Sequence, residues 1–425
     1  MKKITLSLAI VLISCISIFA QTWTQQTSPV PTPLGINSAW AVDYNICWMS
    51  GAAGVCIRTT NGGTTWTRVD AGLAGTDCYT ICALDANTAW IGAGDGGLWR
   101  TTNAGTTWTF FPLTPASPFI DVVHFFNANT GFVLGDPFAS MWCYYTTTNG
   151  GTNWTSSPNR PPSVGTEAGW NNSYEALDVD HIWWGTNVNK IYKGPLNGPF
   201  TFGPTVSASS FGIAFKDLTT GLAIMANAAG SAVLPVEKSI NGGTSWSGTG
   251  YTPTISFGLK SRGGWFWYSS QTVVSRSTND GTSWVSQLTL PTNNAGYALT
   301  MYSVNRGWVG TQGSSALACK IYRYDDVVGI NNNQNQTPTK FTMSQNYPNP
   351  FNPTTYIDFN LANTGYVTLK VYDMMGREVI TLVDGVYSEG VHNVIFNANQ
   401  FSSGTYFYTM TSGDFKETRT MMLIK

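Results

Sequence analysis

The chain has 425 residues, of which only 11% are charged, and its formal net charge is −1. Soluble domains average about 25% charged residues, so long surface helices rich in Lys and Glu are not expected, whereas the abundant Thr, Trp and Tyr favour strands. A net charge near zero builds no field for nucleic acid or an anionic membrane, which excludes nucleic-acid binding as a function.

The first 20 residues predict a signal peptide. Lys2 and Lys3 precede an apolar run from Ile4 to Ile13, and Ala20 supplies a small residue at the expected cleavage point. A lipoprotein signal ending at Cys15 is the alternative. The apolar run is too short to span a bilayer permanently and no later stretch is long enough, so no transmembrane segment is expected.

Five eight-residue segments repeat almost letter for letter, and each has the form Thr/Ser-x-Asn-x-Gly-Thr-x-Trp. They occupy residues 59–66, 101–108, 147–154, 239–246 and 277–284. The Asn can hydrogen-bond its own backbone, the Gly tolerates positive φ, and the Trp can pack the turn against a sheet. The segments therefore predict tight β-turns, and they resemble the Asp-box (BNR) repeat with Asn in place of the usual Asp.

The spacing of the repeats predicts the fold. The gap from Trp154 to Trp246 is twice the normal spacing, and a degenerate unit fills it, with Phe202 in place of the Trp. A seventh unit at 307–324 lacks its last strand, which residues 22–26 can supply. We therefore expect an all-β chain in which residues 21–328 form a seven-bladed β-propeller closed by an N-terminal strand. In blade two the strands are expected at 78–83, 89–92, 97–100 and 108–111.

The cysteines leave two readings open. Cys47 and Cys56 could face each other across one hairpin and form a disulfide after export, or the six cysteines that follow the signal could be buried free thiols. No CxxC motif is present and the three histidines are scattered, so neither a metal site nor a cofactor is predicted.

The chain changes character after residue 328. Residues 329–340 are a polar linker, and residues 341–425 alternate apolar side chains with turn dipeptides, which predicts a small antiparallel, Ig-like β-sandwich. Its ordered motifs include Tyr347-Pro-Asn-Pro-Phe-Asn-Pro353, Val371-Tyr-Asp-Met-Met-Gly-Arg-Glu-Val379 and Met421-Met-Leu-Ile-Lys425. They closely resemble the type A C-terminal sorting domain of the type IX secretion system. The resemblance implies that the partner is the type IX machinery, that the protein crosses the outer membrane, and that it is secreted or displayed on the cell surface.

The strand reading also predicts a functional face. Box turns and the hairpins between first and second strands lie on one face of a propeller. The other face carries the loops between second and third strands and the inter-blade connections, of which residues 156–174 are the longest. The residues placed there as a binding surface for a glycan or a protein are Asp95, Asp136, Arg160, Trp170, Asn187, Asn189 and Gln312.

Four carboxylates are candidates for catalysis. Asp95 and Asp136 lie on the functional face, and Asp121 and Glu175 are placed at the starts of first strands. Two carboxyl groups about 5–10 Å apart are the minimum for acid/base hydrolysis of a glycoside, although carboxylates that cap loops fit the same pattern.

Sialidase is disfavoured, because that family clamps its substrate with three arginines and only Arg160 is placed on the functional face. Arg262 and Arg306 are placed in first hairpins, on the opposite face. The segments Ala89-Trp-Ile-Gly92, Gly307-Trp-Val-Gly310 and Gly135-Asp-Pro137 are similar to the photosystem II assembly-factor-like propellers, whose members are binding scaffolds. A non-catalytic binding or adhesion propeller is therefore the leading hypothesis, and a glycoside hydrolase is the alternative.

Overall fold

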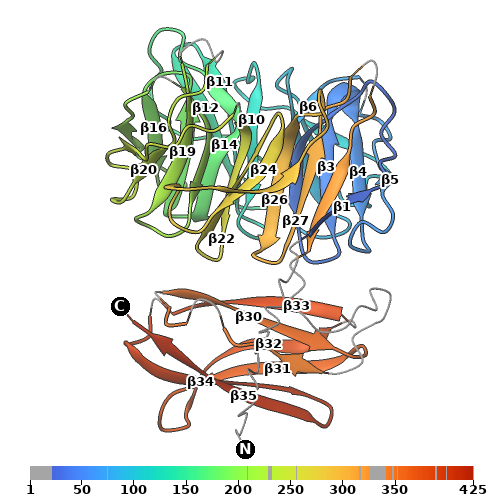
Figure 1. Cartoon of the computed structure of the whole chain (residues 1–425), viewed down its shortest axis with the longest axis vertical. Helices are drawn as coiled ribbons and strands as arrows, with labels where there is room; N and C mark the ends of the chain where they lie inside the picture. The colour runs from blue at the N-terminus through green and yellow to red at the C-terminus, as the bar shows by residue number, and fades with distance from the viewer. Residues whose placement is uncertain are drawn as a thin grey trace, which may run out of the picture.

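The computed structural model describes residues 22–424 except 74, 208, 228–231, 255, 315–316, 326–340, 347–348, 352, 388–389 and 399. The predicted signal peptide, and the predicted linker at 329–340, lie outside the described residues. Strands dominate the described part of the chain (Figure 1), and the helical element found there is one short 3-10 turn, η1 (Ala52–Gly54).

Seven four-stranded antiparallel sheets are formed by the described residues between 22 and 325. Each sheet is named here by its first strand. The β2, β6 and β10 sheets contain β2 (Ile36–Ala41), β3 (Cys47–Gly51), β4 (Cys56–Thr59), β5 (Thr67–Arg68); β6 (Cys78–Ala83), β7 (Ala89–Ala93), β8 (Leu98–Thr101), β9 (Thr109–Phe111); and β10 (Ile120–Phe125), β11 (Gly131–Phe138), β12 (Met141–Thr147), β13 (Thr155–Ser156). The β14 and β18 sheets contain β14 (Gly169–Asp178), β15 (His181–Thr186), β16 (Lys190–Gly194), β17 (Thr201–Pro204); and β18 (Ser209–Phe215), β19 (Gly221–Ala226), β20 (Glu237–Ser239), β21 (Ser247–Gly248). The β22 and β26 sheets contain β22 (Ser256–Arg262), β23 (Trp265–Ser270), β24 (Val273–Ser277), β25 (Val285–Thr289); and β26 (Gly296–Ser303), β27 (Arg306–Thr311), β28 (Ile321–Asp325).

The fourth strand of the β26 sheet comes from the other end of the chain. β1 (Thr22–Gln26) pairs antiparallel with β28, with Thr22 opposite Asp325 and Gln26 opposite Ile321. Trp23 packs on Tyr324 with ring centroids 5.2 Å apart. The predicted pairing of residues 22–26 with the last repeat is therefore confirmed.

The first strands pack in sequence around a common centre. Each one contacts the first strand of the next sheet, and β26 contacts β2 as well as β22. The chain thus has a propeller-like architecture in which the sheets stand side by side (Figure 1).

The repeated segments form the predicted turns between third and fourth strands. In the first of them the Asn61 Oδ1 accepts a hydrogen bond from the Thr65 backbone N–H at 2.9 Å, and the Thr59 Oγ1 accepts one from the Gly63 N–H at 2.8 Å. Gly63 has φ 83, which a side chain would disfavour. The same pair of bonds recurs in the other four turns.

One detail of the degenerate unit differs from prediction. Phe202 does not replace the missing Trp, because its side chain on β17 is 50% exposed. Phe200 packs instead against Tyr144 of the preceding sheet and Trp184 of its own, with ring centroids 4.9 and 4.7 Å apart. Phe200 precedes the strand by one residue, so it can turn inward where Phe202 points to solvent.

The six cysteines among the described residues are buried free thiols. Cys47 pairs with Thr59 and Cys56 with Ser50, so the two thiols are offset along the β3–β4 hairpin rather than opposite each other. Of the two readings that the sequence left open, the structure supports free thiols.

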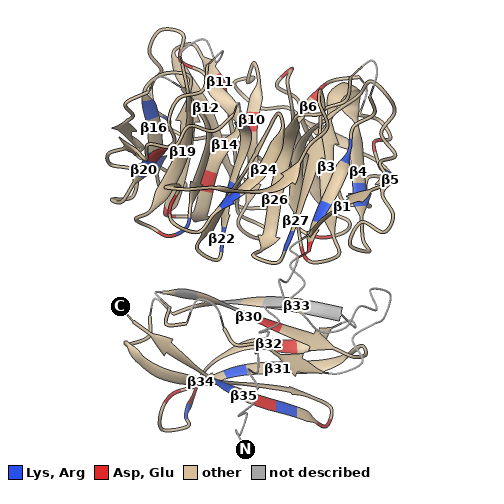
Figure 2. Ribbon diagram, viewed as in Figure 1, with Lys and Arg blue, Asp and Glu red and all other residues tan. Residues whose placement is uncertain are grey.

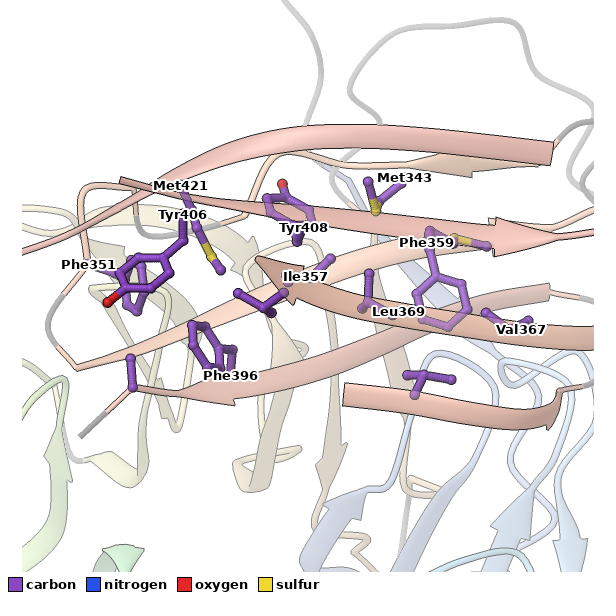
Figure 3. Packing of buried hydrophobic residues seen from close by; sticks show 14 of the residues in the cluster. Met343, Phe351, Ile357, Phe359, Val367, Leu369, Phe396, Tyr406, Tyr408 and Met421 are labelled. Atoms are coloured by element: carbon purple, nitrogen blue, oxygen red, sulfur yellow. The ribbon is translucent and has the colours of Figure 1, made fainter. Parts of the chain in front are cut away.

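The C-terminal residues form two further antiparallel sheets. One has the order β29 (Thr342–Met343), β30 (Thr354–Leu361), β33 (Gly390–Asn397), and the other β32 (Glu378–Tyr387), β31 (Gly365–Tyr372), β34 (Gly404–Ser412), β35 (Phe415–Leu423). Figure 3 shows the core that both sheets share, with Ile357 and Phe359 of β30 beside Leu369 and Tyr408 of the second sheet. This unit therefore has a hydrophobic core of its own.

Candidate binding site at the mouth of the central channel

A cavity of about 450 Å³ runs between the first strands of six sheets, those of β2, β6, β10, β14, β22 and β26. Each first strand begins at the face that carries the inter-sheet connections and the loops between second and third strands, called here the loop face. It ends at the hairpin to the second strand, on the hairpin face, where the box turns also lie. The cavity is lined from one end of these strands to the other.

At the loop face every first strand is irregular. In six of them one residue is skipped in the pairing with the second strand, which is the signature of a β-bulge. The skipped residues are Asn37, Tyr79, Asp121, Phe211, Phe257 and Tyr297. A bulge turns its side chain away from the regular alternation, and three of these residues, Asn37, Phe257 and Tyr297, line the cavity.

Aromatic side chains meet in pairs around this mouth. Phe257 stacks on Tyr297 with ring centroids 3.9 Å apart, and Tyr79 lies 5.0 Å from Phe119. Trp170 meets Phe211 edge to face at 4.3 Å. Tyr297 remains 37% exposed. Partly exposed aromatic faces of this kind can stack on a sugar ring or a peptide side chain.

Asn172 reaches across the channel at the same level. Its Oδ1 accepts a hydrogen bond from the Ser38 hydroxyl at 3.2 Å, and its Nδ2 donates to the Tyr79 carbonyl at 2.8 Å. Asn172 belongs to β14, whereas these partners lie on β2 and β6, so its side chain narrows the loop-face opening. Its φ of 59 shows that the backbone bends to place it there.

Two of the predicted carboxylates come together beside Gly169. The Asp136 Oδ1 accepts a hydrogen bond from the Gly169 N–H at 2.8 Å. On the other side, a Cβ at Gly169 would lie 2.5 Å from the Asp121 Oδ2. Asp121 is 2% exposed and its Oδ2 has no hydrogen-bond partner in the described part of the chain. Burial raises the pKa of Asp121 well above its usual range, with a further contribution from the Asp136 charge, and burial also raises the pKa of Asp136.

Asp95 lies on the same face as Asp136, since both follow second strands, but it is exposed and holds its own turn together. Its Oδ1 accepts from the Gly97 N–H at 3.0 Å and its Oδ2 from the Thr76 hydroxyl at 3.1 Å.

Gln312 is also used in hydrogen bonds within the protein, because its Nε2 donates to the Ile36 carbonyl at 3.0 Å. It also donates to the Asn37 Oδ1 at 2.8 Å and so joins the β26 and β2 sheets.

The long connection after β13 is fixed from within. Glu167 is 5% exposed; its Oε1 accepts from the Trp142 indole at 3.2 Å and its Oε2 lies 3.0 Å from the Lys190 Nζ. Asn187 uses both polar atoms of its side chain on the same connection, at the Ala168 N–H and the Thr166 carbonyl. These residues shape the loop face.

The three other predicted binding residues differ in exposure. Asn189 is exposed at the β15–β16 turn. Arg160 and Trp170 are half-buried, and the Arg160 Nη1 and the Trp170 Nε1 have no hydrogen-bond partner among the residues described. Of the three, Asn189 is the exposed side chain, whereas the unpaired nitrogens of Arg160 and Trp170 are buried.

Glu175 differs from its predicted place. Because β14 begins at Gly169, Glu175 lies well inside the strand, opposite Trp183 and near the hairpin face. Lys260 of β22 stands opposite Trp267, which is the equivalent register, so the two charges are at one level of the channel. Figure 2 marks acidic residues in β14 and basic residues in β22. Burial raises the pKa of Glu175, while the charges of Arg262 and Lys260 oppose that rise.

Sequence reasoning placed Arg262 on the hairpin face but missed Lys260 and its neighbours in this part of the channel. Lys260 lies over the Tyr174 ring at 5.4 Å, and the Tyr174 hydroxyl is 3.1 Å from the His124 Nδ1. Burial, reinforced by Lys260 and Arg262, lowers the pKa of His124 to about 3, so this histidine is neutral at physiological pH. Aligning the repeats on the aromatic residue of the second strand would have placed Glu175 and Lys260 at the same level.

In the part of the chain that the structure describes, no group of three or more His, Cys, Asp and Glu side chains could hold a metal ion. No helix in that part is long and apolar enough to cross a membrane.

Comparison with known proteins identifies the C-terminal unit. Residues 345–425 match the family model of the secretion system C-terminal sorting domain. These residues are a type IX sorting domain. The sorting domain indicates a secreted substrate of that system, either released or attached to the cell surface.

The preceding residues are similar in fold to known propellers. A structure of YCF48 bound to D1 peptide is 16% identical, with a TM-score of 0.54 over 72% of this chain and 95% of that one. YCF48 from Cyanidioschyzon merolae is 17% identical, with a TM-score of 0.53 over 71% and 98%. The WD40 β-propeller domain of Doa1 is 10% identical, with a TM-score of 0.50 over 71% and 97%. These likenesses establish a β-propeller fold, and no curated protein matches the sequence.

Proposed function

We propose that this type IX substrate is a non-catalytic binding propeller, which captures a protein or a glycan at the channel mouth on its loop face. The supporting observation is the mouth itself, where the Phe257–Tyr297 pair lines the cavity together with Asn37 and Asn172. Two further aromatic pairs lie at the loop-face ends of neighbouring first strands. Sites for small molecules and chain ends combine apolar surface with a few polar groups in this way.

The proposal includes a closed ring of seven blades over residues 21–328. Support comes from the seven four-stranded sheets, from the contact of β26 with β2, and from the pairing of β1 with β28. It also includes a signal peptide at 1–20, a linker at 329–340 and an Ig-like sandwich at 341–425. The five box turns with shared hydrogen bonds support their assignment as BNR repeats.

The placement of the carboxylates favours binding over catalysis. A general acid and its partner must both reach the substrate. Asp121 is 2% exposed, and Asp95 accepts a hydrogen bond from the backbone of its own turn. Glu175 lies toward the other end of the channel. Among the proteins of similar fold, YCF48 has a structure bound to D1 peptide, which supports a peptide as one ligand class.

The test is to screen residues 21–425 against a glycan panel and a peptide library and to compare variants of the mouth. Tyr297→Ala and Trp170→Ala should each weaken capture of the ligand found by about tenfold, since a stacked aromatic residue contributes about 1–2 kcal/mol. Phe110→Ala is the matched control, because Phe110 is 50% exposed on the outer strand β9. Capture that is insensitive to both mouth variants would contradict the assignment of the site.

A glycoside hydrolase is the second candidate, and one observation favours it. Asp121 and Asp136 interact, and the raised pKa of Asp121 is what a general acid requires. Turnover of a polysaccharide that Asp136→Asn abolishes would establish the enzyme. Retention of the ligand without turnover, equal in wild type and Asp136→Asn, would exclude it.

Export can be tested separately. A monomeric fluorescent protein carrying a signal peptide and residues 341–425 should reach the medium or cell surface of a type IX-competent host. It should stay in the periplasm when residues 415–425, which contain β35, are removed.

A further inference from the structure

We propose that the hairpin end of the channel is a second binding site, which takes a small anionic group, a carboxylate or a phosphate, between Lys260 and Arg262. This site is distinct from the loop-face mouth and does not depend on what is captured there.

The register places one ring of seven side chains across the channel. Each lies opposite the same position of its second strand. The pairs are Trp40 with Trp48, Cys82 with Trp90, His124 with Phe132, Glu175 with Trp183, Ala214 with Leu222, Lys260 with Trp267, and Thr300 with Trp308. Ala214 is the small residue between Glu175 and Lys260, so the two long side chains can reach toward each other across it.

Two residues further along each strand, nearer the hairpin face, the channel wall becomes apolar around Arg262, and the other cation at this level, Lys216, is paired with Asp280 and does not line the cavity. Arg262 shares this level with Tyr302 and with four aliphatic or aromatic residues. These four are Val42, Leu84, Phe126 and Leu177, and all of them line the cavity. A guanidinium in an apolar collar keeps its charge poorly hydrated, which strengthens its attraction for an anion.

The two cations are not neutralised by salt bridges. Within the described residues, neither Lys260 nor Arg262 has a carboxylate within 4 Å, and the hydrogen bond recorded for Arg262 goes to the Ser261 carbonyl at 2.8 Å. Glu175 acts on both through space only, and it accepts hydrogen bonds from the Phe215 and Ala176 backbone. His124 adds no charge, since it is neutral.

Lys260, Arg262 and Glu175 together carry a net charge of +1, while Asp43 and Asp358 act on the neighbouring Tyr302 from outside the cavity lining. Burial lowers the pKa of Lys260 and raises the pKa of Glu175, because each charged form loses hydration that its neighbours do not fully replace. An anion between Lys260 and Arg262 would supply that compensation, as charge-assisted hydrogen bonds do in other buried sites.

The hairpin end of the channel faces the sorting domain (Figure 1), whose Asp358 acts electrostatically on Tyr302 at the level of Arg262. At the loop face Asn172 spans from β14 to Ser38 and Tyr79 and narrows the channel. At the other end the collar around Arg262 borders the cavity directly. The volume of about 450 Å³ is within the range of small-molecule pockets.

The experiment titrates residues 21–425 with acetate and, separately, with inorganic phosphate at constant ionic strength, followed by calorimetry. Saturable binding of at least one anion is expected. Lys260→Met and Arg262→Gln should each weaken it about tenfold or more, because each removes one charged donor. Glu175→Gln should tighten it, since it removes the repelling charge. The comparison of acetate with phosphate identifies which chemistry the site prefers.

Matched controls separate this site from general charge effects and from misfolding. Arg68→Gln and Lys416→Met change exposed cations elsewhere and should leave anion binding unaltered. Lys260→Arg keeps the charge and should retain binding. Tyr297→Ala, at the loop face, should leave it intact even if capture there is lost. Absence of saturation by either anion, or equal binding by wild type, Lys260→Met and Arg262→Gln, would overturn the proposal.

Discussion

The buried Asp121 carboxyl is the residue whose environment departs most from what its position in the sequence suggests. It lies at a bulge of β10, beside Gly169 and within the influence of the Asp136 charge. Its contribution to stability therefore depends on pH. With a folded-state pKa above the unfolded value, its stabilisation is fully present below the unfolded pKa and is lost as the pH rises through the folded pKa.

Asp121→Asn replaces the protonated acid by a neutral group of the same shape, so it should remove this pH dependence. As the pH rises from 4 to 8, the free energy of unfolding of the variant should increase relative to that of wild type by about 1–3 kcal/mol, because the variant has no carboxyl group there that must ionise in a buried place. Urea unfolding at several pH values measures the difference. Asp95→Asn, in an exposed turn, serves as control and should show no comparable trend; equal trends in the two variants would contradict the assignment.

The thiols give a second prediction at this scale. All six are buried, and burial raises the pKa of Cys82 and of Cys78 to about 12. Because the thiolate is the reactive form, the native protein should react with a thiol reagent at pH 8 far more slowly than the unfolded protein. Counting the thiols modified with and without denaturant checks this. Rapid modification of the native protein would show that a cysteine is accessible.

At the scale of the element, the box turn is held by one side chain. Asn61 receives the Thr65 N–H and donates from its Nδ2 to the Thr65 hydroxyl, at 2.9 Å in both cases. Asn61→Ala removes both bonds and should cost about 1–2 kcal/mol in the free energy of unfolding. Asn61→Asp keeps the acceptor and should cost less. Urea unfolding of the two variants compares them directly, and an equal loss would mean that the acceptor is not what holds the turn.

Elements were predictable where the determinant lies inside one repeat. The strand expected at 78–83 is β6 (Cys78–Ala83), and the turns form at the repeated Asn-x-Gly segments, because a turn depends on its own few residues. The missed features depend on how repeats face one another. Asn172 of the β14 sheet hydrogen-bonds to another sheet, and Glu175 interacts electrostatically with Lys260 although the β18 sheet lies between their sheets. Phe200, rather than Phe202, packs on the preceding sheet.

The candidate site was likewise predictable only where its features depend on a single repeat. The loop face and the common side of Asp95 and Asp136 follow from strand order alone. The engagement of Gln312, Asn187 and Glu167 in joining sheets and loops could not be read from one sequence. A polar residue at the end of a strand looks the same in the sequence whether it binds a ligand or hydrogen-bonds to a neighbouring loop. Only the three-dimensional contacts distinguish the two roles.

At the scale of the whole molecule, the joint between the two ends of the propeller is the feature that unites its sheets. β1 pairs with β28 of the β26 sheet and also contacts the first box turn, in the β2 sheet. Gln26 makes this second link: its Oε1 accepts from the Trp66 indole at 2.9 Å, and its Nε2 donates to the Gly62 carbonyl at 3.0 Å. The two links hold neighbouring sheets from opposite ends of the sequence together.

Gln26→Ala should therefore weaken the closure. It removes both hydrogen bonds and leaves the buried Trp66 indole without its partner, at a cost of about 1–3 kcal/mol. Gln25→Ala is the matched control, because Gln25 is exposed on the same strand, and its cost should stay within about 0.5 kcal/mol. Urea unfolding followed by tryptophan fluorescence measures both. If the ring unfolds as one unit, Gln26→Ala should shift the main transition. An early, separate transition would instead show that β1 detaches by itself, and equal effects of the two variants would mean that the Gln26 link does not close the ring.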